Sequence, residues 1–162
     1  MLTLEPIHAA SPELPALTRL MERAFPANER MPMSTLLTRP GSDMLAILED
    51  GQFRGFISLL TRMDICHILF FAVEEEARGR GLGAEALALV RARKPGLRII
   101  ADLECPDGQA PNAAQRLRRW RFYERCGYAA TGVTYVWRGE HYAIVSNGGA
   151  VTDDEFWRFW NE

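Results

Sequence analysis

Arg78-Gly79-Arg80-Gly81-Leu82-Gly83-Ala84 is the stretch that decides the fold of this 162-residue chain. It joins an apolar run, residues 65–73, to a helical pattern over residues 84–91. A glycine-rich turn that opens a helix leaves several backbone N–H groups unpaired, and the helix dipole adds positive potential there. Glycine permits a close backbone approach, and two arginines add fixed positive charge. The stretch therefore predicts a phosphate-binding turn, and we expect its ligand to carry a pyrophosphate.

The spacing of the glycines separates the classes of pyrophosphate ligand. A P-loop is excluded because no Lys-Ser or Lys-Thr follows the glycines. Gly79, Gly81 and Ala84 satisfy the dinucleotide pattern G-x-G-x-x-A, and Asp102 lies near the end of the next predicted strand. That pattern requires its first glycine directly after the strand, whereas residues 74–78 intervene here. The dinucleotide interpretation, an NAD(P)-dependent oxidoreductase, is therefore the weaker one.

Two ordered motifs carry a family resemblance. As R-x-x-G-x-G, with Arg78, Gly81 and Gly83 in the defining places, the turn resembles the acyl-CoA motif of the GNAT acetyltransferase superfamily. Residues 121–128, Arg-Phe-Tyr-Glu-Arg-Cys-Gly-Tyr, are similar to the F-Y-x-x-x-G-[FY] signature that follows it in that superfamily. The distance between the motifs leaves room for a helix, a strand and another helix. The resemblance covers roughly residues 66–128.

Length and composition favour one globular domain spanning residues 1–162, since 48% of the residues are hydrophobic. The formal charge of −2 gives no reason to expect nucleic-acid binding. Cys66, Cys105 and Cys126 form no C-x-x-C pair, so no metal site is predicted. Residues 1–7 lack a signal-peptide pattern, and no apolar run approaches the ~20 residues of a membrane span. We expect a cytoplasmic protein that binds no membrane.

The hydrophobic pattern predicts alternating strands and helices, with a hairpin turn at Asp50-Gly51. The expected strands cover residues 2–7, 44–49, 52–61, 65–73, 97–104, 128–137 and 142–145, and the expected helices cover 12–25, 34–39, 81–93, 112–126 and a last segment capped by Thr152. For this order the resemblance implies an α/β fold: a mixed, largely antiparallel sheet with helices on both faces. The last helix is an addition to that pattern, and its four large aromatic residues predict packing on the sheet or on a second copy, as a homodimer.

The resemblance implies an acetyl-CoA-dependent N-acetyltransferase. The turn amides would bind the pyrophosphate, and the backbone of the preceding strand end would pair with the pantetheine arm and polarise the thioester carbonyl. The superfamily often has asparagine where Arg116 stands, so Arg116 is an atypical candidate. The alternative for the strand is a purely structural role in the core. The candidate cofactor-binding residues are Phe71, Ala72, Val73, Arg78, Gly79, Arg80, Gly81, Leu82, Gly83, Ala84 and Arg116.

Tyr123, in the second motif, is the candidate general acid. A phenol with a pKa near 10 is protonated at neutral pH and can protonate the departing thiolate. Two residues are candidate bases for the amine: His67, in the strand before the turn, and Glu104, at the end of the next strand. Water alone is the third option. Each residue also has a purely structural interpretation: Tyr123 as a packed core aromatic, His67 as a core histidine and Glu104 as a solvated side chain.

The acceptor is expected to be an amine of a small molecule or peptide. In the superfamily the loop between the first two helices covers the acceptor site, which places Glu29 and Arg30 as candidate substrate-binding residues. Residues 25–32, Phe-Pro-Ala-Asn-Glu-Arg-Met-Pro, resemble a bacterial branch of unassigned substrate. Glu29 would then bind a cationic acceptor, although an exposed loop pair is the simpler interpretation. A non-catalytic coenzyme A-binding sensor is the alternative function.

Overall fold

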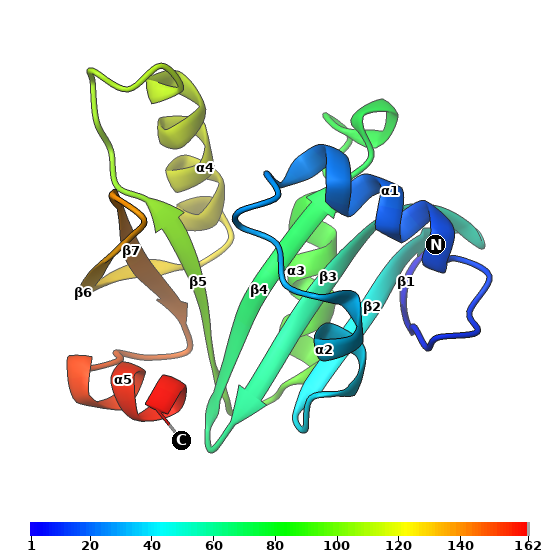
Figure 1. Ribbon diagram of the computed structural model, residues 1–162, viewed down its shortest axis with the longest axis horizontal. Coiled ribbons are helices and arrows are strands. Elements are labelled where there is room, and N and C mark those ends of the chain that lie inside the picture. The colour runs from blue at the N-terminus through cyan, green and yellow to red at the C-terminus, as the bar shows by residue number, and fades with distance from the viewer. Residues whose placement is uncertain (162) are drawn as a thin grey trace. The chain divides into compact units, whose positions relative to one another are not determined.

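The computed structural model describes residues 1–161 (Figure 1). The strands are β1 Leu2–Pro6, β2 Ser42–Glu49, β3 Gln52–Arg62, β4 Ile65–Val73, β5 Arg98–Glu104, β6 Ala129–Trp137 and β7 Glu140–Asn147. The helices are α1 Leu14–Ala24, α2 Met33–Thr38, α3 Leu82–Arg93, α4 Ala113–Arg125 and α5 Asp153–Asn161, with a 3-10 turn, η1, at Glu75–Ala77. The strand order is β1-β2-β3-β4-β5-β7-β6, and β1 pairs with β2, β2 with β3, β5 with β7 and β6 with β7 in antiparallel fashion. This confirms the predicted α/β class.

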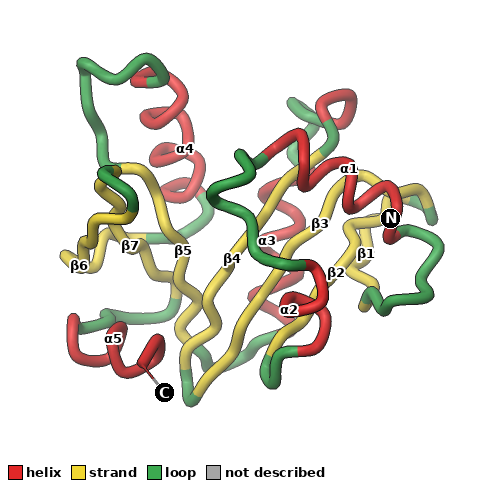
Figure 2. The backbone as a smooth tube through the Cα atoms, viewed as in Figure 1, coloured by secondary structure: helices red, strands yellow, loops and turns green. Residues whose placement is uncertain are grey.

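The chain divides into two compact units that share strand β4. Residues 1–61 and 68–93 form the first unit, which contains β1, β2 and helices α1 to α3. Residues 62–67 and the chain from residue 94 onward form the second unit, which contains β5 to β7, α4 and α5 (Figure 2). The expectation of one domain over the whole chain remains a prediction. None of the helices in the described residues has the length and apolar character needed to cross a bilayer.

In the first unit, the predicted hairpin at Asp50-Gly51 is confirmed. Glu49 pairs with Gln52, and both turn residues have positive φ, 50° and 84°, as a two-residue hairpin of this type requires. Gly55 on β3 lies so close to the neighbouring strand that a Cβ there would stand 2.3 Å from the carbonyl oxygen of Ala72. This close approach fixes β4 against β3 just before the glycine-rich turn.

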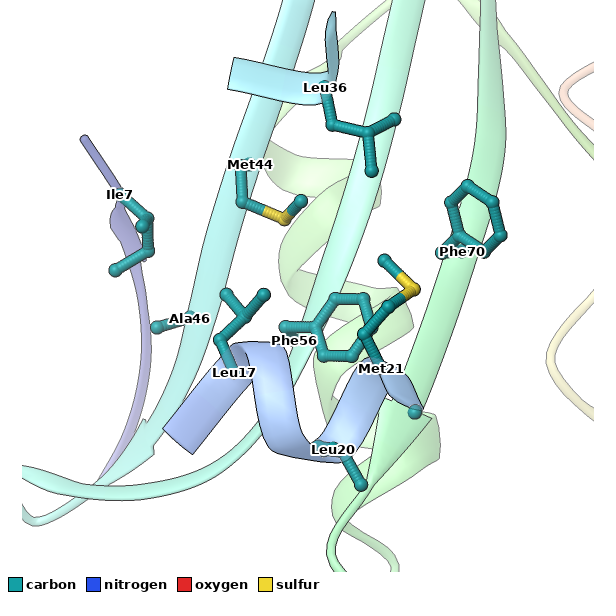
Figure 3. Packing of buried hydrophobic residues seen from close by; sticks show 10 residues of the cluster. Ile7, Leu17, Leu20, Met21, Leu36, Met44, Ala46, Phe56 and Phe70 are labelled. Atoms are coloured by element: carbon teal, nitrogen blue, oxygen red, sulfur yellow. The ribbon is translucent and has the colours of Figure 1, made fainter. Parts of the chain in front are cut away.

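Helices cover both faces of the first unit, as predicted. The amphipathic α1 and the short α2 bury apolar residues against one face, where Phe56 and Phe70 lie (Figure 3). Helix α3 covers the opposite face, where Leu82 and Ala86 pack with Leu2. Helix α1 begins two residues later than predicted, because the Ser11 hydroxyl accepts a hydrogen bond from the His8 N–H and closes the preceding turn. β4 is thus packed on both faces.

In the second unit, helix α5 packs on its own sheet. The predicted cap is confirmed: the Thr152 hydroxyl accepts the Glu155 N–H at 3.2 Å, and the Glu155 carboxylate accepts the Thr152 N–H at 3.1 Å. Phe156 and Phe159 are buried, and the Phe156 ring stacks on Tyr135 of β6 at 5.8 Å. Of the two packing modes predicted for this helix, the structure therefore shows packing on the sheet, while the homodimer remains a prediction.

Candidate active site

The turn between β4 and α3 has the backbone geometry of an anion-binding site. Gly79 and Gly81 have φ of 80° and 77°, in the left-handed region that favours glycine, and open space surrounds both. The N–H of Glu85 donates to the carbonyl of Gly81 at 3.1 Å. This is the first hydrogen bond of the helix. The N–H groups of residues 82–84 therefore have no acceptor within the helix. A pyrophosphate fits such an array of donors at a helix N-terminus.

The two arginines of the turn lie beside exposed backbone and add charge to it. Arg78 donates from Nε to the carbonyl of Val73 at 3.2 Å, and Arg80 forms an ion pair with Glu49 at 3.2 Å. A hydrogen bond from Arg54, with the nearby charge of Arg80, lowers the pKa of Glu49. Arg80 keeps about half of its side-chain surface, 48%, exposed. The turn thus carries two arginine charges, of which Glu49 offsets one.

The side chains at the end of β4, just before the turn, pack in the core. Phe70 and Ala72 belong to the cluster beneath α1 and α2, whereas Phe71 and Val73 pack on the α3 face. This alternation is what a strand covered on both faces requires. The 3-10 turn η1 separates β4 from Gly79, so the glycines do not follow the strand directly, as the dinucleotide pattern requires. Ala72 is buried, and Phe71 and Val73 are partly buried, so the side chains of this strand end belong mainly to the core.

Tyr123 lies on α4 and is buried in an aromatic contact. Its ring meets those of Phe122 and Tyr128 edge to face, at 5.3 and 5.2 Å between centroids. Burial raises the pKa of the Tyr123 phenol above its ordinary value. Within residues 1–161 no hydrogen-bond partner of its hydroxyl is found. The raised pKa keeps the Tyr123 phenol protonated at neutral pH, and its role as a general acid remains a prediction.

Glu104 and Arg116 form an ion pair in the second unit. The buried Arg116 guanidinium pairs with Glu104 at 3.0 Å and Glu140 at 3.1 Å, and donates to the carbonyl of Cys105 and the side-chain oxygen of Asn112. Glu104 also accepts from Arg119 at 3.4 Å. Because these bonds use the guanidinium and the carboxylate, both residues are built into the attachment of α4 to β5.

His67 has a partner at each ring nitrogen. The indole N–H of Trp160 lies 3.2 Å from Nδ1, and Nε2 contacts the carboxylate of Asp102. An indole nitrogen only donates, so Nδ1 carries no proton and Nε2–H donates to Asp102. The Tyr135 hydroxyl donates to the other oxygen of Asp102. The buried imidazole is thus a link in a polar chain and has no nitrogen free to act as a base.

Asp102 is a polar residue of the β5 core whose partners the sequence did not indicate. It drew attention only through the dinucleotide pattern, and its partners His67 and Tyr135 lie 35 and 33 residues away in the sequence. The alternation of β5 was the available signal, because the polar Asp102 interrupts the buried run of Ile100, Ala101 and Leu103. The structure shows its side chain about one quarter exposed, at 24%.

Glu29 and Arg30 lie in the loop between α1 and α2 of the first unit (Figure 2). The Glu29 N–H donates to the carbonyl of Pro26 at 2.9 Å, which forms a tight turn and leaves the residue exposed. The Nε of Arg30 is buried, and among the described residues it has no hydrogen-bond partner. The first unit therefore contains the turn, residues 71–73 and this loop, and the second contains Tyr123, His67, Glu104 and Arg116.

Comparisons with known proteins agree with this fold. A GNAT-family protein from Bacteroides thetaiotaomicron superposes with a TM-score of 0.80 at 18% identity, covering 96% of this chain and 92% of that one. An aminoglycoside 6′-N-acetyltransferase from Enterococcus faecium has a TM-score of 0.69 at 16% identity, covering 94% and 99%. A GNAT-family acetyltransferase from Elizabethkingia anophelis with acetyl-CoA bound has a TM-score of 0.63 at 16% identity, covering 90% and 97%.

The solved structures share less than a quarter of their residues with this chain, so their likeness shows the fold alone. No curated protein matches the chain. The family model described as the acetyltransferase (GNAT) family matches residues 14–128, from the start of α1 to the end of the second motif. Since these residues make up well over half of the sequence, the protein belongs to the GNAT acetyltransferase family.

Proposed function

We propose that the protein is an acetyl-CoA-dependent N-acetyltransferase, which transfers an acetyl group to a primary amine of a small molecule or peptide. The observation that carries the proposal is the turn between β4 and α3. Its glycines Gly79 and Gly81 have positive φ and open surroundings, directly before a helix N-terminus. Its place in a chain of the acetyltransferase family favours coenzyme A as the pyrophosphate ligand.

In this proposal the N–H groups of residues 79–84 bind the pyrophosphate, flanked by the charges of Arg78 and Arg80. The backbone of residues 71–73 pairs with the pantetheine arm, and one of its N–H groups polarises the thioester carbonyl. Arg116 has protein partners for its guanidinium, so we assign it to holding α4 instead of the cofactor. The bound cofactor supplies the acetyl group as an activated thioester.

Transfer proceeds by direct attack in a ternary complex. The amine nitrogen forms a bond to the thioester carbon, the C–S bond breaks, and Tyr123 protonates the departing thiolate. His67 and Glu104 are engaged by protein partners, so water is assigned to take the proton that the amine loses. Burial raises the pKa of the Cys126 thiol, which disfavours the thiolate that a covalent acyl carrier needs. Glu29, on its exposed loop, is proposed to contact the acceptor.

Thiol release from acetyl-CoA tests the activity. Purified protein is expected to release coenzyme A only when an amine from a panel of polyamines, aminoglycosides, amino acids and short peptides is present. Release is followed with a sulfhydryl reagent after subtraction of Cys66, Cys105 and Cys126. If coenzyme A binds but no amine supports release, the result favours the non-catalytic sensor and contradicts the transferase.

Replacing Gly81 by valine is expected to weaken coenzyme A binding at least about tenfold, because a branched side chain at positive φ distorts the turn and blocks its N–H groups. Calorimetric titration with coenzyme A measures the effect. Gly96→Val is the matched control, since the φ of Gly96, 78°, is close to the 77° of Gly81 and its surroundings are equally open, but it lies in another turn. Equal coenzyme A affinity in the two variants would place the pyrophosphate elsewhere.

A further inference from the structure

Arg30, in the loop between α1 and α2, has a positive charge for which the protein supplies no partner. Its Nε is buried, and no hydrogen bond or ion pair of its side chain is found within residues 1–161. A buried donor without an acceptor costs stability, so such groups are rare in folded proteins and call for an explanation. Arg30 as a whole is only partly buried, so an anion from solution can reach the guanidinium and satisfy this donor.

Packing holds the loop on both sides of Arg30. Before it, the Phe25 ring meets Phe70 of β4 edge to face at 5.1 Å. After it, Met31 packs on the same apolar cluster beneath α1 and α2. The backbone that carries Arg30 is therefore anchored to the core, which reduces the conformational entropy that is lost when a ligand binds.

The same contacts anchor the loop beside the end of β4. Phe70 directly precedes residues 71–73, whose backbone polarises the thioester in the proposed function. Directly after them, Glu74 pairs at 2.7 Å with Arg23, which lies in the last turn of α1. All of these residues belong to the first unit. An acceptor held by Arg30 would therefore have its amine near the backbone that presents the acetyl group.

The charges of the loop favour a carboxylate as the anion. Among residues 25–32 only Glu29 and Arg30 are charged, and Arg23 is engaged by Glu74. The loop thus offers a single positive charge, whereas a phosphate monoester carries nearly two negative ones. The planar guanidinium matches a carboxylate, whose two oxygens can accept from Nε–H and an Nη–H side by side. Glu29 is exposed in the same loop and has the charge to contact an ammonium group of the same molecule.

We propose that Arg30 binds a carboxylate of the acceptor, so that the enzyme acetylates amino acids and other amines that carry a carboxylate in preference to simple amines. The inference rests on the proposed N-acetyltransferase function and narrows its substrate class. Arg30 takes no part in proton transfer. The carboxylate stays unchanged while the amine loses a proton to water and forms its bond to the thioester carbon, and the C–S bond breaks.

The test uses pairs of acceptors that differ only in the carboxylate. Each pair is an amino acid and the amine left when hydrogen replaces its carboxylate, such as L-lysine with cadaverine or L-phenylalanine with 2-phenylethylamine. The wild type should prefer the amino acid. We expect Arg30→Gln to lower kcat/KM for the amino acid about tenfold or more, mainly through KM, with little change for the paired amine.

Two further variants control for charge. Arg30→Lys keeps the positive charge but lacks the planar guanidinium, so its kcat/KM for the amino acid should lie between those of the wild type and Arg30→Gln. Arg19→Gln is the matched control, since Arg19 is an exposed arginine of α1 in the same unit, and this variant should behave as the wild type on both members of a pair.

Calorimetric titration of the proteinogenic amino acids into the coenzyme A-saturated proteins gives a readout that needs no turnover. Binding to the wild type and Arg19→Gln that is lost in Arg30→Gln supports the inference, even if no amine is acetylated and the proposed activity fails. The inference is overturned if the wild type neither binds nor acetylates any amino acid, or if binding is unchanged in Arg30→Gln.

Thermal unfolding separates this role from a structural one. Because no protein group pairs with the Arg30 side chain, Arg30→Gln should keep the thermal stability of the wild type. A fall in stability, together with an equal loss of kcat/KM on both members of a pair, would assign Arg30 to the fold and overturn the inference.

Discussion

Replacing Tyr123 by phenylalanine is expected to lower kcat about 10²- to 10⁴-fold, the usual contribution of a positioned general acid. The thiolate would then leave without a proton from the enzyme. Because no partner of the Tyr123 hydroxyl is found in the described residues, its removal leaves no group unpaired there, and thermal stability should change little. Thiol release under saturating acetyl-CoA measures kcat, and calorimetry measures coenzyme A affinity, which should be kept.

Tyr128→Phe is the matched control for this variant. It removes a hydroxyl from the ring that packs edge to face on Tyr123, and it should retain most of the wild-type kcat. A tyrosinate absorbance titration adds an independent check. Since burial raises the pKa of Tyr123, a late-titrating tyrosine of the wild type should be missing from Tyr123→Phe. Wild-type kcat in Tyr123→Phe would show that the thiolate takes its proton from water.

Arg116→Met is expected to reduce the free energy of unfolding by about 3 to 5 kcal/mol, as when one partner of a buried ion pair is removed. The substitution leaves Glu104 and Glu140 without the guanidinium that lies 3.0 and 3.1 Å from them, and it removes the donor to the Cys105 carbonyl. Guanidinium chloride unfolding followed by circular dichroism measures the change. Helix α4 carries Tyr123, so activity should fall as well.

The matched control for this prediction is Arg118→Met on the same helix. Arg118 is exposed, and a surface substitution of this kind usually changes stability by about 0.5 kcal/mol or less. Arg116→Lys keeps the positive charge but lacks the planar guanidinium and its several donors. Its free energy of unfolding should therefore lie between those of the wild type and Arg116→Met. If Arg116→Met were as stable as Arg118→Met, the ion pairs of Arg116 with Glu104 and Glu140 would add nothing to stability. Contact between Arg116 and the cofactor would then regain support.

The features that the sequence predicted correctly are local ones. The glycine turn, the hairpin at Asp50-Gly51 and the Thr152 cap each depend on residues within a few positions of one another, so spacing is sufficient to find them. The family followed from two such motifs in the right order. Helix ends were displaced by one or two residues, as at Leu14, where a side-chain hydrogen bond competed with the helix.

The polar side-chain partners could not be predicted in the same way. His67 meets Trp160 across 93 residues and Asp102 across 35, and Arg116 meets Glu140 across 24. Such contacts depend on strand order and register, which periodicity does not encode. The sequence could therefore offer His67 and Glu104 as bases by position alone. Only their partners show that both side chains are engaged by other residues of the protein.

Strand β6 stands last in the sheet order, and its pairing with β7 shifts register between Ala130 and Thr134. A long, regular outer strand is a template on which other chains can add and aggregate, and a bulge is one of the devices that prevents this. Here the break interrupts the row of outward N–H and C=O groups. The regular part left for another strand to extend the sheet is residues 134–137, too short for an aggregating edge.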